Sequence, residues 1–168
     1  MTSIQLSVVA TGTVAVVAAA AGTAAYMTSS SSCLTIEQAE KAGKIVRKDG
    51  DSSDYWFSNN LASLGNNASF LVASISENEG WWNSKYDSQL KPLKGGNNRA
   101  SSKEFQKVTK GYDKDDKAAL NKVCDAAYKE NIVKFTNNGD SEKKKYADDV
   151  QRFCTNEKSA SLKFEADS

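Results

Sequence analysis

The sequence predicts a mainly α-helical domain attached to a membrane by one apolar N-terminal segment. All of the charged residues lie beyond position 36, the first being Glu37, and the apolar residues after it recur at helical spacing. Strict apolar–polar alternation, which is typical of half-buried strands, is absent. We divide the 168 residues into a transmembrane segment (4–27), a flexible linker (28–34), a small helical-bundle domain (35–158) and a ragged tail (159–168).

The predicted transmembrane segment at 4–27, called the head below, contains no charged side chain. As a helix it would span about 36 Å, which is enough to cross a hydrocarbon core of about 30 Å. We expect an uncleaved signal anchor bound by membrane lipid. A cleaved secretory signal is the alternative, because the small residues at 22–25 offer cleavage sites. A buried core helix is disfavoured, since nothing polar faces outward along the segment.

Small residues recur along this head, among them Gly12, Ala18 and Gly22. Such rows let helix backbones approach closely in lipid and favour self-association. The alternative is that an alanine-rich segment produces these rows by accident. Cys33 follows the serine-rich linker, but lipid attachment is disfavoured because Ser30 stands where a branched aliphatic residue is usual.

The first elements of the body are predicted from caps and apolar spacing. Thr35 and Gln38 form a capping-box pattern that begins a helix closed by Gly50. Apolar residues within 55–64 predict a second helix. The apolar run at 68–75 is either a short buried strand or the start of a helix, and periodicity alone does not decide between them.

The middle of the body predicts one more helix around the tryptophans. Ser76 and Glu79 form a second capping-box pattern, and Trp82 and Tyr86 follow at i, i+4 spacing. Pro92, the single proline, is expected to end this helix near residue 91.

The C-terminal part predicts three further segments. A short capped segment begins at Ser101 and stops before Gly111. A longer helix begins at Asp113, with its apolar face at 120–128. A turn at 137–139 precedes the last helix, which starts at Asp140 or Ser141.

Cys124 and Cys154 fall on the inward faces of the last two predicted helices. A disulfide between them would close a loop of about 30 residues and stabilise the fold by about 2–4 kcal/mol. The alternative is two buried, reduced thiols that act as small apolar side chains. A metal site is not expected, because the chain has no histidine and no Cys-x-x-Cys pair.

Four aromatic residues, Trp56, Trp81, Trp82 and Tyr86, form either core or a ligand-binding aromatic surface. Helical spacing favours the core. Asn67 begins an Asn-Ala-Ser sequon, which has meaning only in a glycosylating host.

Composition excludes several function classes. The 22 basic and 21 acidic residues give a net charge of +1, which argues against a nucleic-acid partner. The absence of histidine removes histidine-based catalysis and histidine-ligated metals. No phosphate-binding glycine loop or nucleophile elbow occurs, so we expect no cofactor, no small-molecule substrate and no catalytic residue. An enzyme that uses carboxylates alone is a third, weaker hypothesis.

Several segments together resemble the uncharacterised paralogous membrane-anchored protein families of haemotropic mycoplasmas. These are the Ala/Gly/Val/Thr-rich segment at 12–26, the serine-rich break, the Trp82 to Tyr86 helix, Cys124, and an aromatic–Cys pair at 153–154. The resemblance implies a membrane-anchored, surface-displayed protein that meets a host. It implies no reaction, cofactor or catalytic residue.

The sequence therefore predicts a non-enzymatic, single-pass protein of the cell membrane with an extracytoplasmic domain. We expect surface interaction or antigenic display, with a host protein or a second copy as partner. One alternative is a scaffold subunit with a cytoplasmic body, which the basic residues Lys41, Lys44 and Arg47 favour under the positive-inside rule. Another is a cleaved, secreted protein.

Overall fold

The computed structural model describes residues 33–48, 50–52, 54–94, 102–136, 139–156 and 161–165. This part of the chain is mainly helical, as the sequence predicts, and contains isolated β-bridges but no strand. The predicted transmembrane segment at 4–27, with Gly12, Ala18 and Gly22, lies outside the described residues. Among the helices that are described, none combines the length and the apolar character needed to cross a bilayer.

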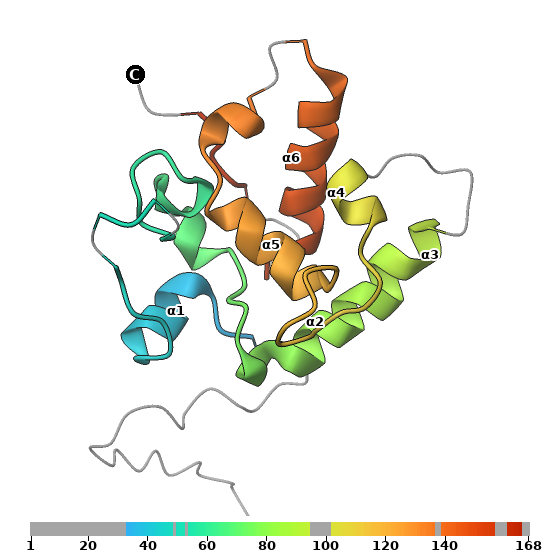
Figure 1. Ribbon diagram of the computed structural model, residues 1–168, viewed down its shortest axis with the longest axis horizontal. Coiled ribbons are helices and arrows are strands. Elements are labelled where there is room, and N and C mark those ends of the chain that lie inside the picture. Colours follow the sequence, from blue (N-terminus) through green and yellow to red (C-terminus); the bar gives the residue numbers. More distant parts are fainter. Residues whose placement is uncertain are drawn as a thin grey trace, which may run out of the picture.

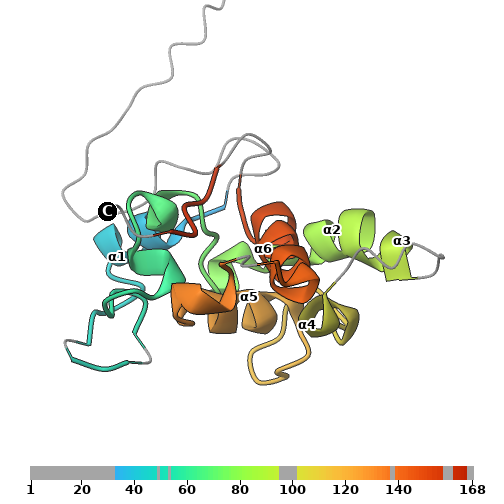
Figure 2. The same ribbon diagram turned by 90° about the horizontal axis from the view of Figure 1, so that it is seen from above.

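The helices are short and are joined by turns. The α-helices are α1 (Ile36–Lys41), α2 (Glu79–Lys85), α3 (Lys91–Lys94), α4 (Lys103–Gln106), α5 (Leu120–Tyr128) and α6 (Ser141–Phe153). Single 3-10 turns occupy Leu61–Ser63, Asn67–Ser69, Ser76–Asn78 and Ile132–Lys134, and Tyr86–Leu90 form a π-helical turn. In Figure 1, α5 and α6 lie at the centre, with α1 on one side and the α2–α3 rod on the other. Figure 2 shows the same order from above.

Helix α1 begins with the predicted capping box. Thr35 Oγ1 accepts the backbone N–H of Gln38 at 3.3 Å, and Gln38 Oε1 accepts the N–H of Thr35 at 3.0 Å. The prediction that this helix continues to Gly50 is wrong. The helix stops before Gly43, which has φ = 69°, a left-handed conformation that favours glycine.

Residues 55–64 form turns, so the helix predicted there is wrong. Asn60 is buried, and its Nδ2 donates to the backbone carbonyl of Asp54 at 2.7 Å. The N–H of Leu61 is held by the distant carbonyl of Glu130 at 2.9 Å. These non-local hydrogen bonds replace the i→i−4 bonds of a helix.

The apolar run at 68–75 contains three consecutive fully buried residues, Leu71, Val72 and Ala73. Val72 forms an isolated antiparallel bridge with Thr35, and Leu71 forms another with Thr155. The segment thus joins the start of α1 to the residues after α6. Of the two alternatives for this run, the short strand does not form, because 3-10 turns on both sides confine the extended backbone to these two single bridges.

The start of α2 differs from the predicted capping box. Ser76 bonds the carboxylate of Glu77, and a 3-10 turn precedes the helix. Asn78 is buried and bonds Leu34 twice, with Oδ1 accepting the N–H and Nδ2 donating to the carbonyl, both at 2.8 Å. The side chain of Asn78 therefore links the start of α2 to the residues before α1, through the two hydrogen bonds that a paired backbone segment would otherwise make.

The rod formed by α2 and α3 continues past Pro92, so the helix end predicted near residue 91 is wrong. Between the two helices the first residue of α3 donates its N–H to the carbonyl of Tyr86, across the π-helical turn. Proline lacks an N–H and crowds the preceding turn of an α-helix. The π-helical turn ends at Leu90, two residues before Pro92, and interrupts the regular α-helical hydrogen-bond pattern there.

Helix α5 begins at Leu120 and not at the predicted Asp113. The intervening loop passes tightly against α2. A Cβ atom on Gly111 would lie 2.4 Å from the Cα of Asn83 and 2.5 Å from the carbonyl oxygen of Trp82. Gly111 is therefore required for this close approach, which is a different role from the helix stop that the sequence suggests.

Helix α6 agrees with the prediction at its start and on its buried face. Asp140 is the N-cap residue, and its carboxylate accepts the N–H of Glu142 at 2.9 Å. The inward face of α6 packs with that of α5 in one core. The largest fully buried side chains of this core are Trp82, Tyr128, Phe105, Phe135, Phe153, Ile36, Leu61, Leu71, Leu90, Leu120, Val72 and Val108.

The segment at 161–165, within the predicted tail, packs against this core. Leu162 is buried, and its N–H donates to the side-chain oxygen of Gln151 at 2.7 Å. Phe164 lies against Phe135, with ring centroids 5.6 Å apart. These residues therefore contribute to the folded domain.

Candidate functional site

Cys124 of α5 and Cys154, directly after α6, form a disulfide. The sulfur atoms are 2.00 Å apart, the Cα atoms are 5.6 Å apart, and 30 positions separate the two residues. Both are fully buried. The sequence predicts this bond because both cysteines fall on inward helix faces.

Tyr128 lies one helical turn beyond Cys124 and ties the disulfide region to the central backbone. Its hydroxyl oxygen lies 3.0 Å from the carbonyl oxygens of both Val72 and Cys154, so its single proton is shared between these two acceptors. The N–H of Val72 donates to the same Cys154 carbonyl at 2.9 Å. Burial raises the pKa of Tyr128 well above its ordinary value, so this hydroxyl stays protonated as a donor.

The four aromatic candidates divide between core and half-buried positions. Trp82 is fully buried, and its Nε1 donates to the carbonyl of Ala73 at 3.2 Å. Trp81 packs edge-on against it, with centroids 4.8 Å apart. Trp56 and Tyr86 are also half-buried against the core. The structure therefore does not gather the four residues into one aromatic surface.

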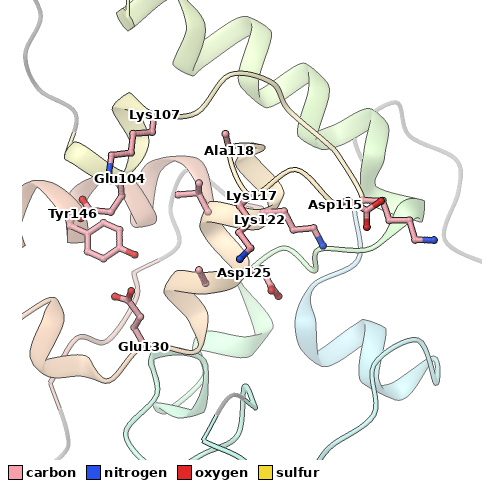
Figure 3. Close-up of a pocket in the computed structure, with 12 residues that line it drawn as sticks. Glu104, Lys107, Asp115, Lys117, Ala118, Lys122, Asp125, Glu130 and Tyr146 are labelled. Carbon is pink, nitrogen blue, oxygen red and sulfur yellow. The ribbon is translucent and has the colours of Figure 1, made fainter.

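An open groove of about 800 Å³ lies beside α5 (Figure 3). Its walls come from α4, the loop before α5, the exposed face of α5, and Tyr146 of α6. Helix α4 is held in place from α6, because Asp149 accepts the N–H of Ser102, the N-cap residue of α4, at 2.5 Å.

One wall of the groove is a loop that Asp113 makes rigid. Asp113 Oδ1 accepts the N–H groups of Asp115 and Asp116, both at 2.9 Å, and Oδ2 pairs with Lys110 at 3.1 Å. The two backbone hydrogen bonds, followed by the lysine, lower the pKa of Asp113 to about 2. Asp113 thus holds the loop and does not start the helix.

Two carboxylates of the groove already have partners. Asp125 accepts a hydrogen bond from Tyr55 and pairs with Lys129 at 2.9 Å. Glu130 accepts a hydrogen bond from Tyr146, and burial raises the pKa of the glutamate. Burial also raises the pKa values of both tyrosines.

Sequence reasoning missed these pairs and the whole groove. Each tyrosine is distant in the chain from the carboxylate that it bonds; Tyr55 and Asp125, for example, are 70 positions apart. No local sequence motif marks such a pair. A second omission concerns Asn67, the sequon residue, which is buried and donates two hydrogen bonds through Nδ2. A glycan on that nitrogen is incompatible with this packing.

Comparison with known proteins identifies no family for this chain. No protein-family model matches the chain, and neither curated proteins nor solved structures give a significant match. Within the described residues, no group of three or more His, Cys, Asp or Glu side chains could hold a metal ion. The disulfide and the groove are therefore the features of the described residues that bear on function.

Proposed function

We propose that this chain is a non-enzymatic, membrane-anchored protein whose helical domain is displayed outside the cytoplasm as an interaction module. The disulfide between Cys124 and Cys154 is the observation that carries the proposal. Disulfides persist in oxidising compartments and are rare in the cytosol, where thiols are kept reduced. The segment at 4–27 would supply the anchor.

Binding rather than catalysis fits the chemistry of the groove. The chain has no histidine, and two acidic side chains of the groove, Asp125 and Glu130, are held by intramolecular partners. Carboxylates in such bonds are poorly placed to act as a free acid–base pair. A wide groove with fixed walls is better suited to holding a partner segment.

Protease treatment of intact cells that express the full chain tests the topology. An external domain should be released by cleavage in the linker at 28–34, and the released fragment should retain the disulfide on a non-reducing gel. Full protection in intact cells, with digestion after the membrane is disrupted, would contradict the proposal. That result would support the cytoplasmic scaffold, which Lys41, Lys44 and Arg47 favour.

The cysteines give an independent measurement. In cells lysed directly into denaturant and a thiol-reactive mass tag, we expect one tag per chain, on Cys33. Three tags per chain would show that Cys124 and Cys154 are reduced in the cell. A Cys33→Ser variant provides the control, since it should take up no tag before reduction and two tags after it.

A further inference from the structure

Four lysines line the groove without an acidic partner. Lys107 directly follows α4, Lys114 and Lys117 come from the loop, and Lys122 comes from α5. Within the described residues none of them makes an ion pair. Some lysines elsewhere, such as Lys144, have a carboxylate at salt-bridge distance.

The acidic side chains of the groove compensate this positive charge only in part. Asp125 is paired with Lys129, whereas Glu130 bonds the neutral Tyr146 and keeps its own charge. Glu104, Asp115 and Glu130 form no ion pair among the described residues. The groups of the groove without an ion-pair partner are therefore four lysines and three acids.

The floor between these charges is apolar and shallow. It contains Ala118 at the end of the loop, and Val123 and Ala126 on the outward face of α5. Ala126 is exposed, and Ala118 and Val123 are half-buried. Small side chains there allow another chain to approach the helix closely.

We propose that this groove binds a peptide segment of a partner protein in which acidic and apolar residues alternate. Carboxylates of the segment would pair with the unpartnered lysines, and its apolar side chains would cover the floor. A uniformly charged polyanion, such as a sulfated glycan, fits less well because Glu104 and Asp115 would repel it. The inference rests on the proposed function as an interaction module, whose binding surface it specifies.

The test measures binding of a fluorescent peptide pool to the oxidised full-length chain in a non-ionic detergent. Each peptide of the first pool has ten residues, with glutamate at alternate positions and leucine, phenylalanine or valine at the positions between them. A second pool carries lysine in place of glutamate, and a third carries serine in place of the apolar residues. We expect saturable binding of the first pool below about 1 mM and much weaker binding of the other two.

Neutral variants connect the binding to the groove. Replacing two groove lysines, Lys117→Gln with Lys122→Gln, should weaken binding about five-fold, in keeping with two exposed ion pairs. The matched control, Lys91→Gln with Lys144→Gln, changes the net charge equally at exposed lysines that do not line the groove and should leave the affinity unchanged. Glu104→Gln should strengthen binding, because it removes a repelling charge.

Three outcomes would overturn the inference. These are no binding of the first pool at 1 mM, equal loss of affinity in the groove and control variants, and binding of the serine pool or heparin as tight as that of the first pool. The last outcome would indicate a general polyanion surface. None of these results bears on topology, so the protease and thiol measurements can support external display even where the groove inference fails.

Discussion

Asn67 and Lys163 are 96 positions apart and hold each other through two hydrogen bonds. Asn67 Nδ2 donates to the Lys163 carbonyl, and the Lys163 N–H donates to Asn67 Oδ1, both at 2.8 Å. The second Nδ2 hydrogen goes to the carbonyl of Leu61 at 2.8 Å. One buried amide thus joins a loop, a 3-10 turn and the C-terminal segment at 161–165, in the way that a paired strand would.

Replacing Asn67 with alanine should destabilise the domain by about 2–3 kcal/mol, because three backbone groups lose their partner in a buried place. The free energy of unfolding in urea, followed by tryptophan fluorescence, measures the change. Asn67→Asp should also destabilise, since it keeps the shape but removes both donors. The control is Asn66→Ala at the exposed neighbouring position, where we expect less than about 0.5 kcal/mol. Similar effects at both positions would contradict this account.

The disulfide should contribute about 2–4 kcal/mol to stability, because it closes a loop of 30 positions in the unfolded chain. We expect the midpoint of urea unfolding to fall by the corresponding amount when Cys124 and Cys154 are both replaced by alanine. The Cys33→Ser background prevents thiol exchange during the measurement.

Reduction provides a check that needs no substitution. In the Cys33→Ser protein, a strong reductant should lower the midpoint about as much as the double replacement does. The doubly replaced protein should not respond to the reductant. An unchanged midpoint on reduction would show that the bond does not stabilise the domain.

The sequence was informative where a helix is decided by its own residues. The capping pattern of Thr35 with Gln38, the N-cap Asp140 and the inward face that carries Cys124 are all local signals, and the structure follows each of them. The disulfide was a candidate for the same reason, since both cysteines fall on the inward faces of helices that are neighbours in the chain, although spacing alone left two reduced thiols as the alternative. Helix ends were less predictable, because Gly43 stops α1 before the better-marked Gly50.

The sequence was uninformative where distant groups decide the backbone. Asn60, Asn67 and Asn78 are buried and bond backbone groups of other segments, so regions with helical apolar spacing form turns instead. From a single sequence, an asparagine is predicted to lie at the surface or in a turn, because that is where the residue is most often found. The groove was missed because its lysines come from separate segments and do not form a run.

Glu130 should make stability fall as the pH rises above about 4.5. Burial raises its pKa in the folded state, so between the unfolded and the folded pKa the native protein holds more protons than the unfolded chain. Stability in that window therefore decreases with pH. Glu130→Gln should flatten this slope and raise stability at pH 7, because the amide can still accept the hydrogen bond from Tyr146.

Glu142→Gln is the matched control for that prediction. Its pKa is lowered by the hydrogen bond from Lys145, so its contribution is present above the unfolded pKa and is lost as the pH falls. This exposed substitution should leave stability at pH 7 unchanged or slightly reduced. Urea unfolding between pH 4 and pH 7 separates the two cases, and a pH slope in Glu130→Gln equal to that of the native chain would contradict the assignment.

Cys33 should react slowly with alkylating reagents in the folded protein. Burial raises the pKa of its thiol from 9.0 to about 11, which lowers the thiolate fraction at neutral pH. The higher intrinsic reactivity of a more basic thiolate offsets part of this loss, so we expect alkylation about ten-fold slower than for an unperturbed cysteine. The rate with iodoacetamide at pH 7.5, followed by mass spectrometry, should rise to the unperturbed value in urea, since the disulfide leaves Cys33 as the reacting thiol. Equal rates with and without urea would show that the thiol is solvated in the native protein and that its partial burial against the core does not depress its reactivity.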